Sequence, residues 1–204
     1  MLKASTTSPW STSPARRREI EADDQGNVYV VNAHRRNESD ILWKYAADGG
    51  IQRVYLSDLG GGVRLLDPVG LCVACGTATA YVASGQIDKS NPQAATVYEF
   101  STEALALRRQ IRIEDMRQVT DITEDPQTGA LWVVGFNLEE SELAVDSWSD
   151  VQESFYRPRL ARISPDGTVE SVPIAGDHDL ALPLSVLCKP NPGSPARLGT
   201  MLRR

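Results

Sequence analysis

The chain has 204 residues, 41% of them hydrophobic and 24% charged, which is enough for one globular core and at the low end for two domains. Residues 1–18 and 189–204 each carry four basic residues and no acidic one. Removing these eight from the 21 basic residues leaves 13 against 27 acidic residues, so residues 19–188 have a net charge of −14. Because such an acidic body would repel a phosphate backbone, we expect no nucleic-acid partner.

The two basic ends are predicted to be disordered segments outside the folded domain. Residues 1–18 contain seven Ser or Thr and two Pro, and residues 189–204 are rich in proline. An organelle transit peptide is the alternative for the first segment, but its prolines oppose the amphipathic helix that such a peptide needs. Neither a secretory signal nor a membrane span is predicted, since no sustained apolar run is present, and the compartment stays open.

Between these ends, one pattern recurs three times at a nearly constant interval. The segments 26–31, 79–84 and 129–134 align on their aromatic residues Tyr29, Tyr81 and Trp132, which are 52 and 51 residues apart. Each segment has an apolar stretch before it and two alternating apolar–polar runs after it. These runs predict first strands at 20–22, 69–73 and 119–123, third strands at 41–45, 96–100 and 160–163, and last strands at 51–55, 105–113 and 169–174.

The recurrence predicts an all-β fold built from four-stranded antiparallel meanders, the size and strand order of β-propeller blades. The predicted blades are 19–62, 63–117 and 118–176, and residues 177–188 are a possible start of a fourth. Three blades cannot close a ring, so each end would expose an apolar blade face. The chain is therefore expected either to be a fragment of a longer propeller or to complete a ring as a homodimer.

At two of the units the sequence resembles the six-bladed NHL-repeat and gluconolactonase-like propeller families. Residues 67–73 (Asp-Pro-Val-Gly-Leu-Cys-Val), followed by Tyr-Val-Ala at 81–83, are similar to an NHL unit, and residues 119–125 with 131–134 are a looser version. The resemblance covers about residues 20–175. It implies a divalent metal such as calcium over the axial channel, with Asp121 and Asp67 as ligands. The chain lacks the Glu-Gly-Pro type of motif of the gluconolactonase-like group, which argues against this metal site. Apart from the metal that the resemblance implies, no cofactor is expected.

The loops that join second to third strands share one face of a propeller, and we expect the binding surface there. These loops are 32–39, 85–95 and 135–158. The expected binding residues are Asn32, His34, Trp148, Phe155 and Tyr156. The aromatic ones are possible anchors for a partner. His34 could act as a base, although a solvated loop residue is the simpler interpretation.

No nucleophile motif or dinucleotide-binding fingerprint is present, and the cysteines offer little chemistry. Cys72 and Cys75 have the spacing of a redox or zinc pair, but buried core positions are the simpler interpretation for a predicted inner strand. The leading hypothesis is a non-catalytic propeller module that binds a protein or glycan through its strand 2–3 loop face. The alternative is a metal-dependent hydrolase or lyase of the gluconolactonase-like type. No membrane partner is expected.

Overall fold

The computed structural model describes residues 16–33, 41–65, 67–84, 94–138 and 156–174, which form three four-stranded antiparallel sheets. Blade 1 contains β1 (Arg16–Ala22), β2 (Val28–Ala33), β3 (Ile41–Tyr45) and β4 (Ile51–Tyr55). Blade 2 contains β5 (Pro68–Val73), β6 (Thr79–Ser84), β7 (Ala95–Ser101) and β8 (Leu107–Ile113). Blade 3 contains β9 (Gln118–Glu124), β10 (Leu131–Leu138), β11 (Tyr156–Ile163) and β12 (Val169–Val172). Strand order follows chain order in every sheet, which confirms the predicted all-β fold class.

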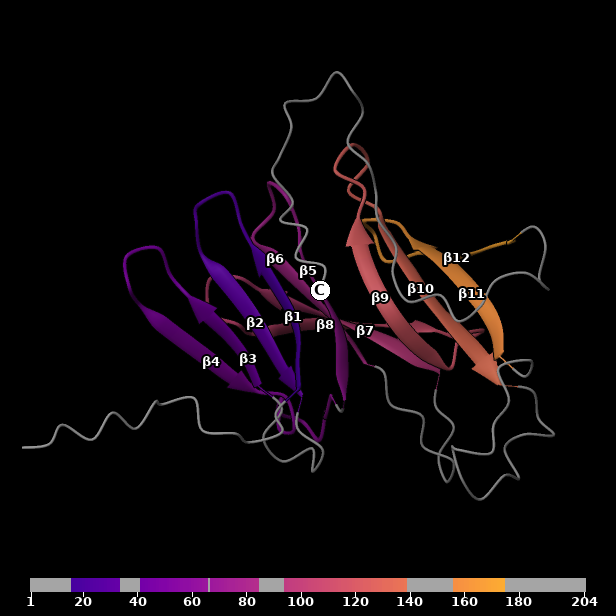
Figure 1. Cartoon of the computed structure of the whole chain (residues 1–204), viewed down its shortest axis with the longest axis horizontal. Helices are drawn as coiled ribbons and strands as arrows, with labels where there is room; N and C mark the ends of the chain where they lie inside the picture. The colour runs from indigo at the N-terminus through magenta and orange to yellow at the C-terminus, as the bar shows by residue number, and fades with distance from the viewer. Residues whose placement is uncertain (1–15, 34–40, 66, 85–93, 139–155, 175–204) are drawn as a thin grey trace, which may run out of the picture.

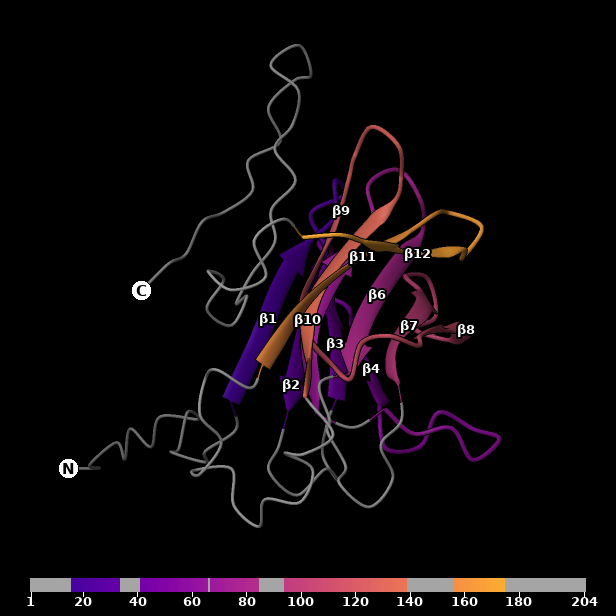
Figure 2. The same ribbon diagram turned by 90° about the vertical axis from the view of Figure 1, so that its right-hand side faces the viewer.

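The first strand of each blade lies at the centre of the molecule and the last strand lies at its outside. β5 packs against both β1 and β9, so the three inner strands form a row. Figure 1 shows this arrangement, with β1 and β9 toward the middle and β4 and β12 at opposite ends. In Figure 2 the molecule is turned so that blade 3 faces the viewer, and the sheets lie one behind another. None of the described segments is a helix long and apolar enough to cross a membrane.

The hydrophobic cores lie between blades and not inside them. One cluster joins blades 1 and 2, and its fully buried members include Tyr29, Leu42 and Phe100. A second cluster joins blades 2 and 3 around Ile113, Met116 and other buried apolar residues. Alternation explains this layout, because every second side chain of a strand points to the same face of its sheet. Each pair of facing sheets therefore buries one apolar face from each partner.

Polar side chains form hydrogen bonds between neighbouring blades in their outer parts. The Lys44 ammonium of blade 1 donates to the Thr102 carbonyl oxygen of blade 2 at 2.8 Å. Arg109 of blade 2 pairs with Glu99 and donates to the Pro165 carbonyl oxygen of blade 3 at 3.0 Å. The inter-blade contacts thus include directional hydrogen bonds as well as apolar burial.

Two strand starts differ from the sequence-based prediction. β1 begins at Arg16, so it includes arginines that the sequence places in the N-terminal segment, and its first residues pair with Ala33 and Asn32. β8 begins at Leu107 and not at Leu105, because Leu105 occupies the turn with a φ of 52°. The possible fourth-blade strand at 180–187 lies outside the described residues.

Candidate functional site

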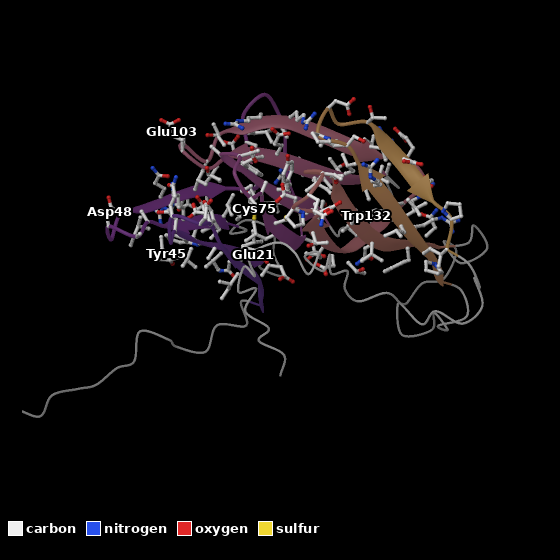
Figure 3. The ribbon with its side chains drawn as sticks, turned by 90° about the horizontal axis from the view of Figure 1, so that it is seen from above. Glu21, Tyr45, Asp48, Cys75, Glu103 and Trp132 are labelled. Atoms are coloured by element: carbon white, nitrogen blue, oxygen red, sulfur yellow. The ribbon has the colours of Figure 1, made fainter. Side chains whose placement is uncertain are left out.

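Three inner strands bring acidic and thiol side chains together near the centre of the molecule, in what we call the axial cluster. Its members are Glu21 of β1, Cys72 of β5, Cys75 just after β5, and Glu124 of β9. Asp121 of β9 borders this cluster: its charge acts on Glu21, but the register places its side chain on the face of β9 opposite to Glu124. Glu124 links two blades directly, because its Oε2 accepts a hydrogen bond of 2.7 Å from the Cys75 backbone nitrogen. Figure 3 labels Glu21 and Cys75, both in the central part of the molecule.

Cys72 is the buried member of the axial cluster. Only 7% of its surface is exposed, and burial raises the pKa of its thiol well above the usual value. The negative charges of Glu21 and Glu124 raise this pKa further. The thiol is therefore protonated and does not serve as a nucleophile, since the thiolate is the reactive form. The expected core role holds for Cys72, whereas Cys75 is only half-buried.

Glu21 is the member whose protonation changes near neutral pH. Loss of hydration among the inner strands raises the pKa of Glu21 from 4.5 to about 7, and the negative charge of Asp121 adds to the effect. The side chain remains exposed, so solvent reaches it and can exchange its proton. A carboxyl group of this pKa is chemically suited to general acid–base chemistry.

We expect the pH dependence of stability to report this raised pKa. Between pH 4.5 and about 7 the folded chain holds a proton on Glu21 that the unfolded chain has lost, so the free energy of unfolding falls as pH rises. Because the side chain is exposed and screened by solvent, the loss should be only about 1 kcal/mol. Glu21→Gln should therefore be more stable than the wild type at pH 8 and equal to it at pH 4.

Urea unfolding at pH 4, 6 and 8 checks this, with Glu103→Gln as the control. Glu103 lies at the opposite side of the molecule, in the turn between β7 and β8 (Figure 3). A difference between wild type and Glu21→Gln that does not change with pH would show that the raised pKa is wrong.

The expected metal ligands lie in different settings. Asp121 is half-buried in β9 opposite Val134, and its Oδ1 accepts a hydrogen bond of 2.8 Å from the Ile122 backbone nitrogen. Asp67 is half-buried just before β5 and has a φ of 48°. Over the described residues, no group of three or more His, Cys, Asp or Glu side chains is arranged to hold a metal ion. The divalent metal therefore stays a prediction from the family resemblance.

The expected binding residues fall mostly outside the described part of the chain. Asn32 is described: it lies in β2 opposite Ile41, and its buried Oδ1 has no hydrogen-bond partner within the described residues. Tyr156 is the first residue of β11 and lies opposite Leu138 of β10. His34, Trp148 and Phe155 lie outside the described residues.

A second surface with functional character covers the side of blade 1 that faces away from blade 2; we call it the aromatic face. The strand register places these side chains on that one side: Ile20, Val30, Trp43, Tyr45, Ile51, Arg53 and Tyr55. Four of them are the exposed large apolar residues of the described chain, at 54% for Ile20, 42% for Tyr45, 63% for Ile51 and 44% for Tyr55.

The side chains of the aromatic face are organised by ring contacts. The rings of Trp43 and Tyr45 stack with centroids 6.1 Å apart and planes inclined by 17°. The Arg53 guanidinium carbon lies 5.4 Å from the ring centroids of both Trp43 and Tyr55. Such cation–π contacts hold a cation against apolar surface that remains open to solvent.

Neither surface was among the sequence-predicted site residues, except that Asp121 borders the axial cluster. The alternation over 41–45 was a usable signal for the aromatic face, because it places Trp43 and Tyr45 on one side of a strand in the first blade. No comparable signal marked Glu21, Cys72 and Glu124, which become neighbours only through the packing of inner strands.

No family model and no curated protein matches the chain. Among solved structures, hydrazine synthase of Kuenenia stuttgartiensis is similar with a TM-score of 0.57 and 11% identity, over 79% of this chain and 44% of that one. A GH43 β-1,3-galactosidase with galactodeoxynojirimycin has a TM-score of 0.47 and 16% identity, over 87% of this chain and 47% of that chain. An exo-β-1,3-galactanase from Clostridium thermocellum has a TM-score of 0.47 and 16% identity, over 77% of this chain and 34% of that chain.

At identities of 11% and 16% the likeness concerns the fold alone. The chain spans less than half the length of each of the three. The chain thus has a β-propeller-like all-β fold whose three described blades do not by themselves make a ring.

Proposed function

We propose that this chain is a non-catalytic β-propeller module that binds a protein partner. The observation that carries the proposal is the aromatic face, where Arg53 lies against Trp43 and Tyr55, and Tyr45 stacks on Trp43, on an open blade surface. Trp, Tyr and Arg are the residues that contribute most to binding energy at protein interfaces. Contiguous exposed apolar surface of this kind typically marks an interaction site in a soluble protein.

The character of this surface favours a protein over a glycan as the partner. Its aromatic side chains share the sheet with exposed aliphatic residues, Ile20 and Ile51, which gain from contact with other apolar side chains. The strand 2–3 loops, where the sequence placed the binding surface, lie largely outside the described residues, so loop binding stays a prediction.

A photo-crosslinking experiment tests the proposal. Tyr55→benzoylphenylalanine places a reactive group on the aromatic face, and Asp48→benzoylphenylalanine places the same group in the exposed turn between β3 and β4. After irradiation in the producing cells, we expect one discrete adduct with the group at position 55 and none at position 48. Mass spectrometry then identifies the second protein. Equal adducts at both positions, or none at 55, would contradict the proposal.

A metal-dependent hydrolase or lyase is the second candidate, and one observation favours it. Glu21 and Asp121 lie on two inner strands, and the charge of Asp121 acts on Glu21 near the axis of the blades, where propellers commonly bind ligands. Calorimetric titration of the folded chain with calcium, zinc and manganese separates the two candidates. If one of these ions binds the wild type but not Asp121→Asn, the metal-dependent enzyme would be favoured over the binding module.

A further inference from the structure

Blade 3, like blade 1, has one face that no described sheet covers. Its packed face carries Leu131, Val133 and Ile163, which join the cluster with blade 2. The register places the alternate residues on the opposite face: Asp121, Thr123, Trp132, Val134, Leu160, Arg162, Glu170 and Val172. Val134 is buried, whereas Trp132, Leu160 and Val172 are half-buried. We call this set the blade 3 face.

The aromatic face and the blade 3 face differ in charge. Among the described side chains named for each face, the aromatic face has one charged residue, Arg53. The blade 3 face has two acids, Asp121 and Glu170, and one base, Arg162. Arg162 and Glu170 are 3.9 Å apart on an exposed part of the sheet, so their pairing is weak and either could take another partner. The two faces therefore carry net charges of opposite sign on largely apolar sheets, which favours their contact.

The chain itself shows how such faces pack. At both blade junctions an inner strand lies on an inner strand, β1 on β5 and β5 on β9. At the junction of blades 2 and 3 the outer strands β8 and β12 also touch. If the same rule applies to the two free faces, β1 lies on β9 and β4 lies on β12. Arg53 of β4 would then face Glu170 of β12.

A single chain cannot bring these two faces together, but a two-fold rotation about the inner strands can. Figure 3 shows Tyr45 and Glu21 on the side of the molecule opposite to Glu103 of blade 2. In a two-fold pair, the aromatic face of each copy meets the blade 3 face of the other, and both contacts form at once.

We infer that the protein partner is a second copy of this chain, which completes a six-bladed ring by docking each aromatic face on the partner's blade 3 face. The inference rests on the proposed function, since it names the partner of the same surface. Association covers exposed sheet faces on both copies, which otherwise invite non-specific aggregation.

Light scattering after size exclusion, at several concentrations, tests this inference. We expect twice the 22.3 kDa mass of one chain. Ile51→Glu places a charge in the contact and should weaken association by about tenfold or more. The matched control is Gln52→Glu, which adds the same charge on the same strand but points to the other side of the sheet. Its association should equal that of the wild type.

An exchange of charges tests the register of the contact. Arg53→Glu alone should weaken association, and Arg53→Glu with Glu170→Arg should restore it, because both contacts of the pair then carry the reversed ion pair. Circular dichroism of each variant shows that the sheets are intact. Failure of the double variant to restore association, with folded protein, would overturn the pairing of β4 with β12.

The outcomes separate this inference from the proposed function. A wild-type chain that stays a monomer, but is crosslinked through position 55 to a different protein, overturns the second copy and supports the binding module. A monomer with no crosslink at position 55 overturns both. A dimer that Ile51→Glu leaves unchanged shows that the two copies associate elsewhere, and it also overturns the inference.

Discussion

Replacing Gly135 with alanine is expected to lower the free energy of unfolding by about 3 kcal/mol, because the added methyl group has no space. Gly135 lies in β10, where the pairing with β9 shifts register. A Cβ there would overlap the Gln118 carbonyl oxygen and would lie 2.8 Å from the Met116 sulfur. The carbonyl belongs to the backbone of the neighbouring strand, so it can move away only if β9 and β10 separate.

Urea unfolding followed by tryptophan fluorescence measures this loss, with Gly50→Ala as the control. Gly50 lies in the exposed turn between β3 and β4, where the nearest atom to a Cβ would be the Asp48 Oδ1 at 3.1 Å. We expect Gly50→Ala to change stability by no more than about 0.5 kcal/mol. Equal stability of Gly135→Ala and the wild type would show that β9 and β10 do not pair as described.

Replacing Phe100 with alanine is expected to cost about 3–5 kcal/mol, the usual range for a fully buried phenylalanine. Phe100 has no exposed surface and belongs to the cluster between blades 1 and 2. Its loss leaves a cavity at the junction of two sheets, and blade 2 cannot move to fill it without breaking its contacts with blade 3. The expected loss is a large fraction of the stability of a domain of this size.

The matched control for Phe100 is Ile51→Ala, on the open side of the same pair of blades. Ile51 is 63% exposed, so its truncation should cost less than about 1 kcal/mol in dilute solution, where copies are separate. Thermal unfolding by circular dichroism compares the two variants. Losses of similar size would mean that the cluster between blades 1 and 2 is not the core of this half of the chain.

Much of the fold could be predicted from the sequence because each blade repeats the same short-range signals. The alternation over 41–45 and 51–55 predicts the bounds of β3 and β4 as the structure has them. Asp-Gly turns between the strands supply the positive φ that tight hairpins need, as Gly49 and Gly167 show with φ of 91° and 92°. Such signals are local, so one chain is sufficient to detect them.

Features that depend on tertiary pairing could not be predicted in the same way. Arg16 and Arg17 show no strand pattern, and they join β1 because Ala33 and Asn32 lie opposite them. Leu105 occupies a conformation with positive φ that its residue type does not indicate. Asp121 was correctly expected at an inner strand, but Glu21, Cys72 and Glu124 lie on three different inner strands, and only blade packing brings them near one another.

The position of the two clusters between blades, and not within them, has a consequence for how this architecture can change. An isolated four-stranded sheet of this chain would expose both faces to solvent, so it would not be stable by itself. Two adjacent sheets share one solvent-excluded interface and are the smallest stable unit. We therefore expect such a chain to tolerate duplication or deletion of whole sheets. Each duplication adds one buried interface between sheets, and each deletion removes one.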